Sequence, residues 1–342
     1  MKRKILFIVT KSENGGAQKW VKEQLDITKE YFDTYLATNK SGWLVDNSNF
    51  LDALIDKKIE SRFSFLYLYN LIKFIKKNRI DLIIASSANA GLYARLAKIF
   101  TNVKVIYVAH GWSAIYNGGR LKFIYIFIER VLSRLSDSIL CVSKADYKNA
   151  VEKIGISSSK LKLIRNKIFP LKRVKESFSE GRIKLVTVSR FRYPKRNDLL
   201  IEAAKDLDIE LYLIGDGPLR SELERLKSNN IHFLGEIDNF SDYYKYDIFV
   251  LISDSEGLPL SALEAMSAKL PLVLSRVGGC VEVVDDNGVL VDNMVDNIKD
   301  GIKMSITNIS KYSENSYKLF NKEFNMHLHK DIYIEYYKKI YR

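Results

Sequence analysis

Residues 248–268 have the sequence IFVLISDSEGLPLSALEAMSA. The uninterrupted apolar run at residues 248–252 is typical of a short strand that is buried on both faces. A polar loop follows at residues 253–259, and residues 260–268 then have the apolar spacing of a helix. A buried strand that leads through a loop into a helix is the repeating unit of parallel α/β proteins. We therefore predict a parallel sheet in this half of the chain.

Short apolar runs alternate with helical stretches on both sides of this segment. In the C-terminal half we expect further strands at residues 185–189, 211–214, 231–234, 271–274 and 288–291, and helices at 198–206 and 218–226. In the N-terminal half we expect strands at residues 5–9, 34–38, 82–85, 103–109 and 138–142, and helices at 66–77 and from residue 143. This pattern predicts two doubly wound, Rossmann-like α/β domains. Ligands bind such sheets outside the carboxyl ends of their strands, so we expect the two domains to face one cleft.

A charged segment without clear periodicity, residues 171–181, separates the two patterns. We therefore place an N-terminal domain at residues 1–170, the linker at 171–181 and a C-terminal domain at 182–325. Residues 326–342 form a tyrosine-rich stretch with helical character at the end of the chain.

Composition and charge restrict the class of protein. The chain has 342 residues, of which 47% are hydrophobic, and this excludes global disorder. Its two cysteines can form neither a disulfide framework nor a zinc cluster, which fits a reducing compartment, and we expect a cytoplasmic protein. Residues 1–170 hold 29 Lys and Arg against 14 Asp and Glu, a net charge of +15, whereas residues 171–342 have a net charge of −2. This excess suits nucleic acid, an anionic membrane or a merely solvated basic surface, and because we find no nucleic-acid-binding module we expect no nucleic-acid partner.

Two sites in the N-terminal half follow predicted strands. Gly15 and Gly16 lie between the first strand and a helix, where the backbone can approach an anionic ligand closely, although an ordinary turn has the same pattern. His110 follows the run at 103–109, where it either hydrogen-bonds a substrate or serves as a structural residue.

Three sites in the C-terminal half also lie at expected strand ends. Arg190 and Lys195 follow residues 185–189, and a guanidinium with an ammonium suits phosphate oxygens, the alternative being a solvated basic loop. Gly215 begins a tight turn after the next strand. Glu256 lies in the loop after residues 248–252 and Glu264 in the following helix, and carboxylates accept hydrogen bonds from sugar hydroxyls.

In their order and spacing these motifs resemble the retaining family-four glycosyltransferases with the GT-B fold, of the type that assembles bacterial O-antigen or capsule. The resemblance rests on four stretches: GGAQ at 15–18, Arg190 to Lys195, GDGP at 215–218, and EGLPL at 256–260 with EAM at 264–266. It covers nearly the whole chain. It also implies that residues 326–342 form a helix that packs on the N-terminal domain, which in this fold binds the acceptor.

The resemblance implies a role for each matching residue. Arg190 and Lys195 would bind the donor diphosphate, and Glu256 would contact the hydroxyls of the transferred sugar. Glu264 would hold the ribose of the nucleotide. The remaining donor contacts would come from the loop glycines, from backbone amides, from a histidine near C6 of the sugar and from the strand beside the base: Gly15, Gly16, His110, Gly215, Leu234, Gly257 and Leu258. We expect His110, Arg190, Lys195 and Glu256 to take part in the reaction itself. No metal and no cofactor besides the UDP-sugar donor is expected.

The expected function is therefore retaining, metal-independent transfer of a hexosyl group to a polyprenyl-diphosphate-linked saccharide, at the inner face of the cell membrane. The family favours an N-acetylhexosamine such as GalNAc from UDP-GalNAc. The alternatives are a hexosyl or deoxyhexosyl transferase that uses another UDP- or GDP-sugar, and a non-catalytic nucleotide-sugar-binding protein.

Segments 66–79 and 120–135 combine apolar residues with cations, which suits a membrane interface or a core helix with basic ends. The expected contacts are the cations Lys73, Lys76, Lys77, Arg120 and Lys122, with insertion of Tyr67, Tyr69 or Phe123.

Overall fold

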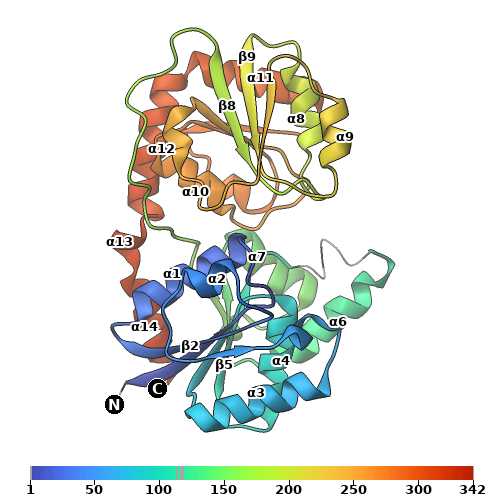
Figure 1. The fold of residues 1–342 in the computed structure, drawn as a ribbon, viewed down its shortest axis with the longest axis vertical. Helices are drawn as coiled ribbons and strands as arrows, with labels where there is room; N and C mark the ends of the chain where they lie inside the picture. Colours follow the sequence, from blue (N-terminus) through green and yellow to red (C-terminus); the bar gives the residue numbers. More distant parts are fainter. Residues whose placement is uncertain (1, 113–114, 116–118, 342) are drawn as a thin grey trace. The chain divides into compact units, whose positions relative to one another are not determined.

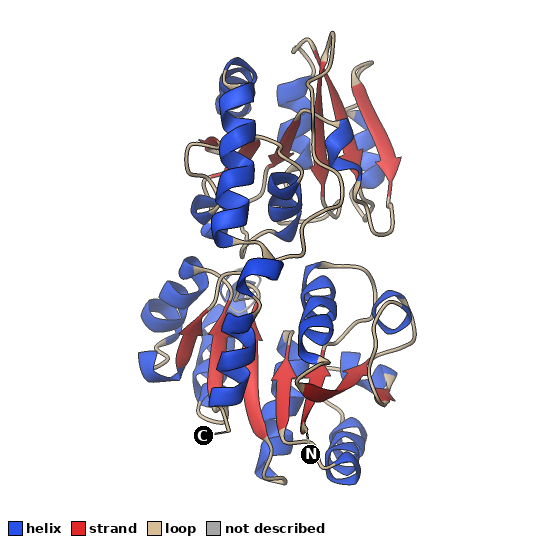
Figure 2. Cartoon of the chain, turned by 90° about the vertical axis from the view of Figure 1, so that its left-hand side faces the viewer, coloured by secondary structure: helices blue, strands red, loops and turns tan. Residues whose placement is uncertain are grey.

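The computed structural model describes residues 2–112, 115 and 119–341. The chain divides into two compact units, unit 1 with Met1–Asn166 and Lys330–Arg342, and unit 2 with Lys167–His329. Each unit is a parallel sheet with helices on both of its faces (Figures 1 and 2). The predicted fold class, two Rossmann-like α/β domains, is confirmed.

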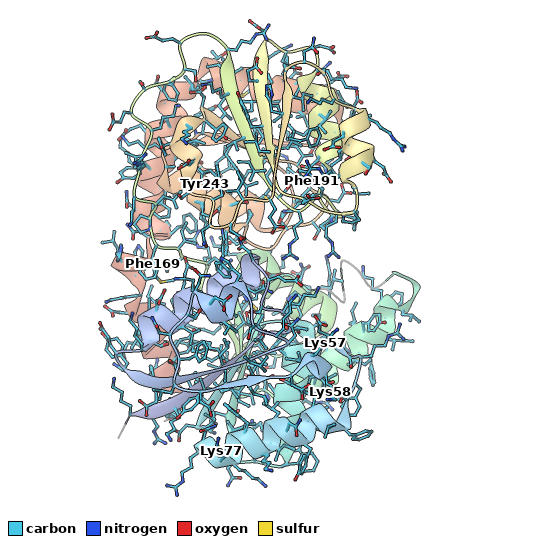
Figure 3. The ribbon with its side chains drawn as sticks, in the orientation of Figure 1. Lys57, Lys58, Lys77, Phe169, Phe191 and Tyr243 are labelled. Atoms are coloured by element: carbon cyan, nitrogen blue, oxygen red, sulfur yellow. The ribbon has the colours of Figure 1, made fainter. Side chains whose placement is uncertain are left out.

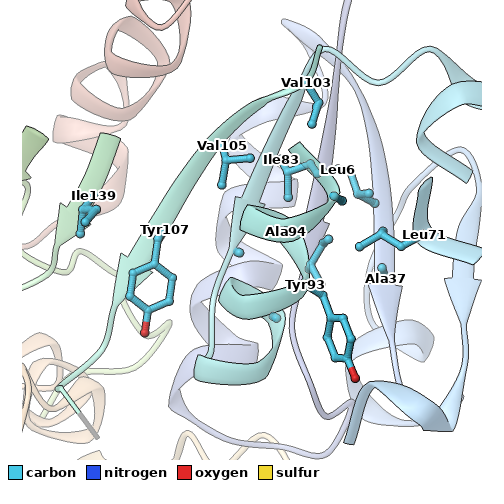
Figure 4. Close-up of a cluster of buried hydrophobic side chains, with 14 of the residues drawn as sticks. Leu6, Ala37, Leu71, Ile83, Tyr93, Ala94, Val103, Val105, Tyr107 and Ile139 are labelled. Carbon is cyan, nitrogen blue, oxygen red and sulfur yellow. The ribbon is translucent and has the colours of Figure 1, made fainter. Parts of the chain in front are cut away.

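Unit 1 contains a seven-stranded sheet with the order β3-β2-β1-β4-β5-β6-β7. Its strands are β1 (Arg3–Ile8), β2 (Phe32–Thr38), β3 (Ala53–Ile55), β4 (Leu82–Ala85), β5 (Lys104–Ala109), β6 (Ser138–Cys141) and β7 (Leu161–Leu163). Its helices are α1 (Gly16–Thr28), α2 (Trp43–Asp46), α3 (Phe65–Asn78), α4 (Ala88–Ile99), α6 (Lys122–Ser133), α7 (Lys144–Asn149) and α14 (Asp331–Lys339). The inner strands β4 and β6 are buried along their whole length, as strands covered on both faces must be. Figure 4 shows part of this core, in which Tyr93 and Ala94 of α4 lie against the sheet.

Unit 2 contains a six-stranded sheet with the order β10-β9-β8-β11-β12-β13. Its strands are β8 (Ile183–Val188), β9 (Ile209–Ile214), β10 (Ile231–Gly235), β11 (Ile248–Leu251), β12 (Leu272–Ser275) and β13 (Gly288–Val291). Its helices are α8 (Asn197–Ala204), α9 (Arg220–Arg225), α10 (Leu260–Ser267), α11 (Val295–Thr307), α12 (Ile309–Glu323) and α13 (Met326–His329). One hydrophobic cluster involves α10 and α12, and a second involves α8 and α11. The strand order reverses between β8 and β11, and in such sheets ligands bind at the carboxyl ends near this reversal.

The chain passes between the units at 166–167 and again at 329–330, a few residues from the boundaries expected from the sequence. Residues 171–181, the expected linker, belong to unit 2, where the buried Lys175 forms an ion pair of 2.9 Å with the buried Asp247. The expected C-terminal helix is split, with α13 in unit 2 and α14 in unit 1. On α14, the buried Tyr336 donates a hydrogen bond of 2.7 Å to Ser138 of β6.

Candidate functional site

Two loops at the carboxyl end of the unit 2 sheet are joined by backbone contacts. The loop after β8 and the loop after β11 form an isolated antiparallel bridge between Lys195 and Ser253. The amide of Arg196 donates to the carbonyl of Ile252 at 2.9 Å, and the amide of Asp254 donates to that of Pro194, also at 2.9 Å. The two loops therefore hold the predicted cation and the predicted glutamate in a defined arrangement.

This arrangement brings Lys195 and Glu256 together. The Nζ of Lys195 donates a hydrogen bond to Oε1 of Glu256, and the two side chains are only 19% and 11% exposed. A half-buried ion pair of this kind offers a cation to a phosphate and a carboxylate to hydroxyl groups within one small volume.

The Glu256 loop lies directly on the glycines that follow β12. A Cβ atom at Gly278, whose φ is +48°, would lie 1.9 Å from the carbonyl oxygen of Glu256. A Cβ atom at Gly279 would lie 2.1 Å from the carbonyl oxygen of Gly257. Any larger residue would therefore push the glutamate loop away from the sheet. Gly257 is half-buried and Leu258 is buried, just before α10 begins.

Glu264 lies on α10 and is almost fully buried, at 8% exposure. The hydroxyl of Tyr243 donates a hydrogen bond of 2.7 Å to its Oε2. Burial and the nearby charge of Glu264 raise the pKa of Tyr243 well above its ordinary value, so this hydroxyl keeps its proton. Tyr243, labelled in Figure 3, comes from the short helix Asp242–Lys245 and was not found from the sequence, because nothing in the local pattern links it to Glu264.

The remaining donor-site candidates of unit 2 lie at the ends of β8, β9 and β10. A Cβ atom at Gly215 would lie 1.9 Å from the carbonyl oxygen of Ser189, the residue before the exposed Arg190. The amide of Gly215 donates to the carbonyl of Gly235 at 2.8 Å, which places the partly exposed Leu234 beside the same turn. Gly215 thus allows three strand ends to approach one another closely.

In unit 1 the candidates lie at the carboxyl end of the other sheet. His110 follows β5, and its Nε2 is 2.6 Å from Oγ of Ser86, which follows β4. The ring of Trp20 on α1 meets the imidazole edge-on at 5.2 Å, and burial lowers the pKa of His110 to about 4. Gly16 begins the same helix, so α1 places the Gly15–Gly16 turn and His110 at one edge of the sheet. A Cβ atom at Gly16 would have no neighbour within 4 Å among the residues that the structure describes.

The predicted residues therefore form two groups, one in each unit: Gly15, Gly16 and His110 in unit 1, and Arg190, Lys195, Gly215, Leu234, Glu256, Gly257, Leu258 and Glu264 in unit 2. A pocket of about 430 Å³ lies beside Lys195, between the loop that carries it and α9. A larger pocket of about 770 Å³ lies at the opposite, amino edge of the unit 1 sheet, near Arg79 and Lys104. Among the described residues, no three His, Cys, Asp or Glu side chains are grouped so that they could hold a metal ion.

The comparisons with known proteins identify the family and agree with the fold. Residues 169–318 match the family described as "Glycosyl transferases group 1", and residues 46–168 match "Glycosyltransferase Family 4". The O-antigen biosynthesis glycosyltransferase WbnH of Escherichia coli is 46% identical over 295 residues, which cover 85% of this chain and 87% of that protein. The UDP-Gal:alpha-D-GlcNAc-diphosphoundecaprenol alpha-1,3-galactosyltransferase of Escherichia coli is 24% identical over 313 residues, covering 81% of each chain. Among solved structures, Anabaena Alr3699/HepE in complex with UDP and glucose superposes with a TM-score of 0.82 at 18% identity, over 98% of this chain and 99% of that one.

Proposed function

This chain belongs to the group 1 and family 4 glycosyltransferases with the GT-B fold, and we propose that it is a retaining enzyme of bacterial O-antigen or capsule synthesis. It moves an N-acetylhexosamine, with GalNAc from UDP-GalNAc as the first choice, to a polyprenyl-diphosphate-linked saccharide. The observation that carries this proposal is the 46% identity, over 85% of the chain, to a protein named for O-antigen biosynthesis.

The geometry of unit 2 supports the proposed handling of the donor. Lys195, together with Arg190, binds the diphosphate, and Glu256 accepts hydrogen bonds from the transferred sugar. Glu264, which Tyr243 orients, accepts hydrogen bonds from the ribose hydroxyls. The direct hydrogen bond between Lys195 and Glu256 suits a donor whose diphosphate and sugar are directly linked.

The proposed mechanism follows from where charge develops. Breaking the anomeric C–O bond leaves an oxocarbenium-like sugar and a nucleoside diphosphate anion, which Arg190, Lys195 and backbone amides stabilise. The acceptor hydroxyl attacks from the face that the diphosphate leaves, and the leaving phosphate oxygen takes the proton. The configuration at the anomeric carbon is thereby retained. His110 stays neutral at pH 7 and therefore contacts the sugar as a hydrogen-bonding group without charge.

The acceptor proposal rests on the basic half of the chain and on one relative. The galactosyltransferase at 24% identity is named for a diphosphoundecaprenol-linked acceptor. In unit 1, Lys73, Lys76 and Lys77 on α3 are exposed and suit an anionic membrane, and Figure 3 shows Lys77 at the end of that helix. The expected insertion of Tyr67 is wrong, because its ring is fully buried against Tyr93. The side chain of Arg120 lies outside the described part of the chain. No helix among the described residues is long and apolar enough to cross a membrane.

Hexosyl transfer from another UDP-sugar is the second candidate, since the same relative is named for UDP-Gal. A panel of UDP- and GDP-sugars, assayed with the purified chain and a lipid-diphosphate-linked N-acetylhexosamine acceptor, separates these functions. The proposal requires product from UDP-GalNAc with an α-anomeric linkage in NMR spectra, also in the presence of EDTA. Product from UDP-Gal alone would replace the sugar assignment, and donor binding without any transfer would identify a non-catalytic binding protein.

A further inference from the structure

Most of the side of α6 that faces water is apolar, although Arg130 is also exposed on this helix. Five of its apolar residues lie on one stripe, because residues three or four positions apart share a side of a helix. Their side chains are between 41% and 82% exposed: Phe123, Ile124, Phe127, Ile128 and Val131. The opposite side provides Ile126, which packs on the core, and the buried Leu132. A helix on the surface of a water-soluble domain normally has one apolar side, which it buries. α6 has a second apolar side, and none of the described residues of unit 1 covers it.

A second apolar segment lies on the other flank of α4. Phe63, Phe65, Leu66 and Tyr69, around the start of α3, are between 41% and 80% exposed. Phe63 stacks on Tyr93 of α4 at 6.0 Å, while Arg95, less than one turn later on α4, binds Glu129 of α6 at 2.9 Å. Figure 1 shows α3, α4 and α6 together in unit 1, and α4 thus connects both apolar segments.

We propose that these two segments insert side by side into the headgroup region of an anionic bilayer, and that apolar insertion rather than the lysines of α3 provides most of the binding. The proposal rests on the proposed function, because it names the surface by which that enzyme reaches a lipid-linked acceptor. α6 has 12 residues and is too short to span a bilayer, but a helix of this kind can lie in the plane of the interface.

The charges around the two segments favour a bilayer over a second copy of the chain. Arg62 beside Phe63, and Lys122 and Arg134 at the ends of α6, are cations at the rim. The carboxylate of α6, Glu129, is already bound by Arg95. A two-fold symmetric dimer places the same patch against itself, so these cations would lie near one another. An anionic leaflet attracts them instead, at the same time as it accepts the aromatic side chains.

The test is sedimentation of the full chain with vesicles of phosphatidylglycerol and phosphatidylethanolamine, and with phosphatidylcholine vesicles. Replacing both Phe123 and Phe127 with Ser should weaken binding to the anionic vesicles about tenfold or more, because two exposed rings no longer leave water. Wild-type binding should weaken with salt but persist at about 1 M, where the Debye length is only about 3 Å. The matched control replaces Met304 and Leu328, which are 51% and 65% exposed in unit 2, with Ser and should bind as the wild type does.

Unchanged vesicle binding by Phe123→Ser/Phe127→Ser would overturn the proposal. So would light scattering that shows a wild-type dimer which this variant dissociates, because the surface would then bind a second copy. Circular dichroism checks that the variant is folded, and transfer to a water-soluble acceptor should be unchanged in it. If the wild type binds the vesicles but transfers no sugar, the proposed function is rejected and the proposed membrane-binding surface is not.

Discussion

Lys195 and Glu256 form an ion pair between two loops of unit 2, and each is a residue expected to bind the sugar donor. In this pair the cation and the carboxylate satisfy one another. In the proposed donor complex, Lys195 contacts the diphosphate and Glu256 contacts the sugar hydroxyls, so this ion pair lies between the two parts of the donor. Under the proposed roles, the residues that bind phosphate and sugar are thus linked by one ion pair.

Replacing Arg190 or Lys195 with Ala should lower turnover about 10- to 100-fold. Each change removes a charge-assisted contact to the diphosphate, worth roughly 1.5–3 kcal/mol, and about 1.36 kcal/mol corresponds to a factor of ten. Steady-state kinetics with saturating acceptor measures the effect. Lys205→Ala, which breaks a surface ion pair with Glu202 on α8, is the control. Near-normal turnover in both single variants would sink the phosphate assignment.

Glu264→Ala should weaken the binding of UDP itself, because the ribose is common to donor and product. Glu256→Ala should leave the affinity for UDP nearly unchanged and reduce transfer, because its partner is the sugar. Isothermal calorimetry with UDP and initial-rate assays distinguish the two effects. The opposite pattern would show that the two glutamates have exchanged roles.

Tyr243→Phe should weaken UDP binding about tenfold while the fold stays intact. The change removes only the hydroxyl that donates to Glu264, a hydrogen bond to a charged group worth roughly 1.5–3 kcal/mol in such cases. Tyr246→Phe changes a neighbouring buried ring for which no hydrogen bond to Glu264 is described, and it should bind UDP normally. Equal affinities of the wild type and Tyr243→Phe for UDP would mean that Glu264 binds the ribose without help from this hydrogen bond.

Gly16→Ala should leave the melting temperature unchanged and raise KM for the donor. The new methyl group meets no described residue within 4 Å, so the cost is expected only when a ligand approaches the turn. Gly91→Ala on α4 is the contrasting variant, since its methyl group would lie 2.5 Å from the ring of Tyr107 and should lower the melting temperature. A donor KM equal to that of the wild type would remove Gly16 from the site.

The stability of unit 1 should fall as the pH is lowered from about 6.5 to about 4. Burial lowers the pKa of His110 to about 4 from its ordinary value of 6.5, so the unfolded chain takes up this proton first. Above pH 6.5 His110 is neutral in both the folded and the unfolded chain, so it no longer makes the free energy of unfolding depend on pH. Urea titrations across this range, with His110→Gln as the reference, measure the contribution, and parallel curves for both proteins would contradict it.

The sequence was sufficient for most of the strands and for several helices, because continuous apolar runs and helical spacing are local signals, but α4, α11 and α12 were not predicted. The edge strands β3 and β7 were missed, since each has only three residues and neither is fully buried. The pairing of Lys195 with Glu256 depends on how two loops 61 residues apart meet, and the bond from Tyr243 to Glu264 depends on tertiary packing. Tyr67 shows the converse limit, because its position on α3 resembles that of the exposed Tyr69 until the packing of α4 is known.

The return of the chain to unit 1 at residue 330 affects the order in which a newly made molecule can fold. Domains usually fold as they leave the ribosome, starting from the N-terminus. Here Gln24 of α1 and Ser138 of β6 receive their partners, Tyr337 and Tyr336, only after all of unit 2 has been translated. During synthesis, unit 1 therefore lacks α14 until the end of the chain has been made, and unit 2 can finish folding before unit 1 does.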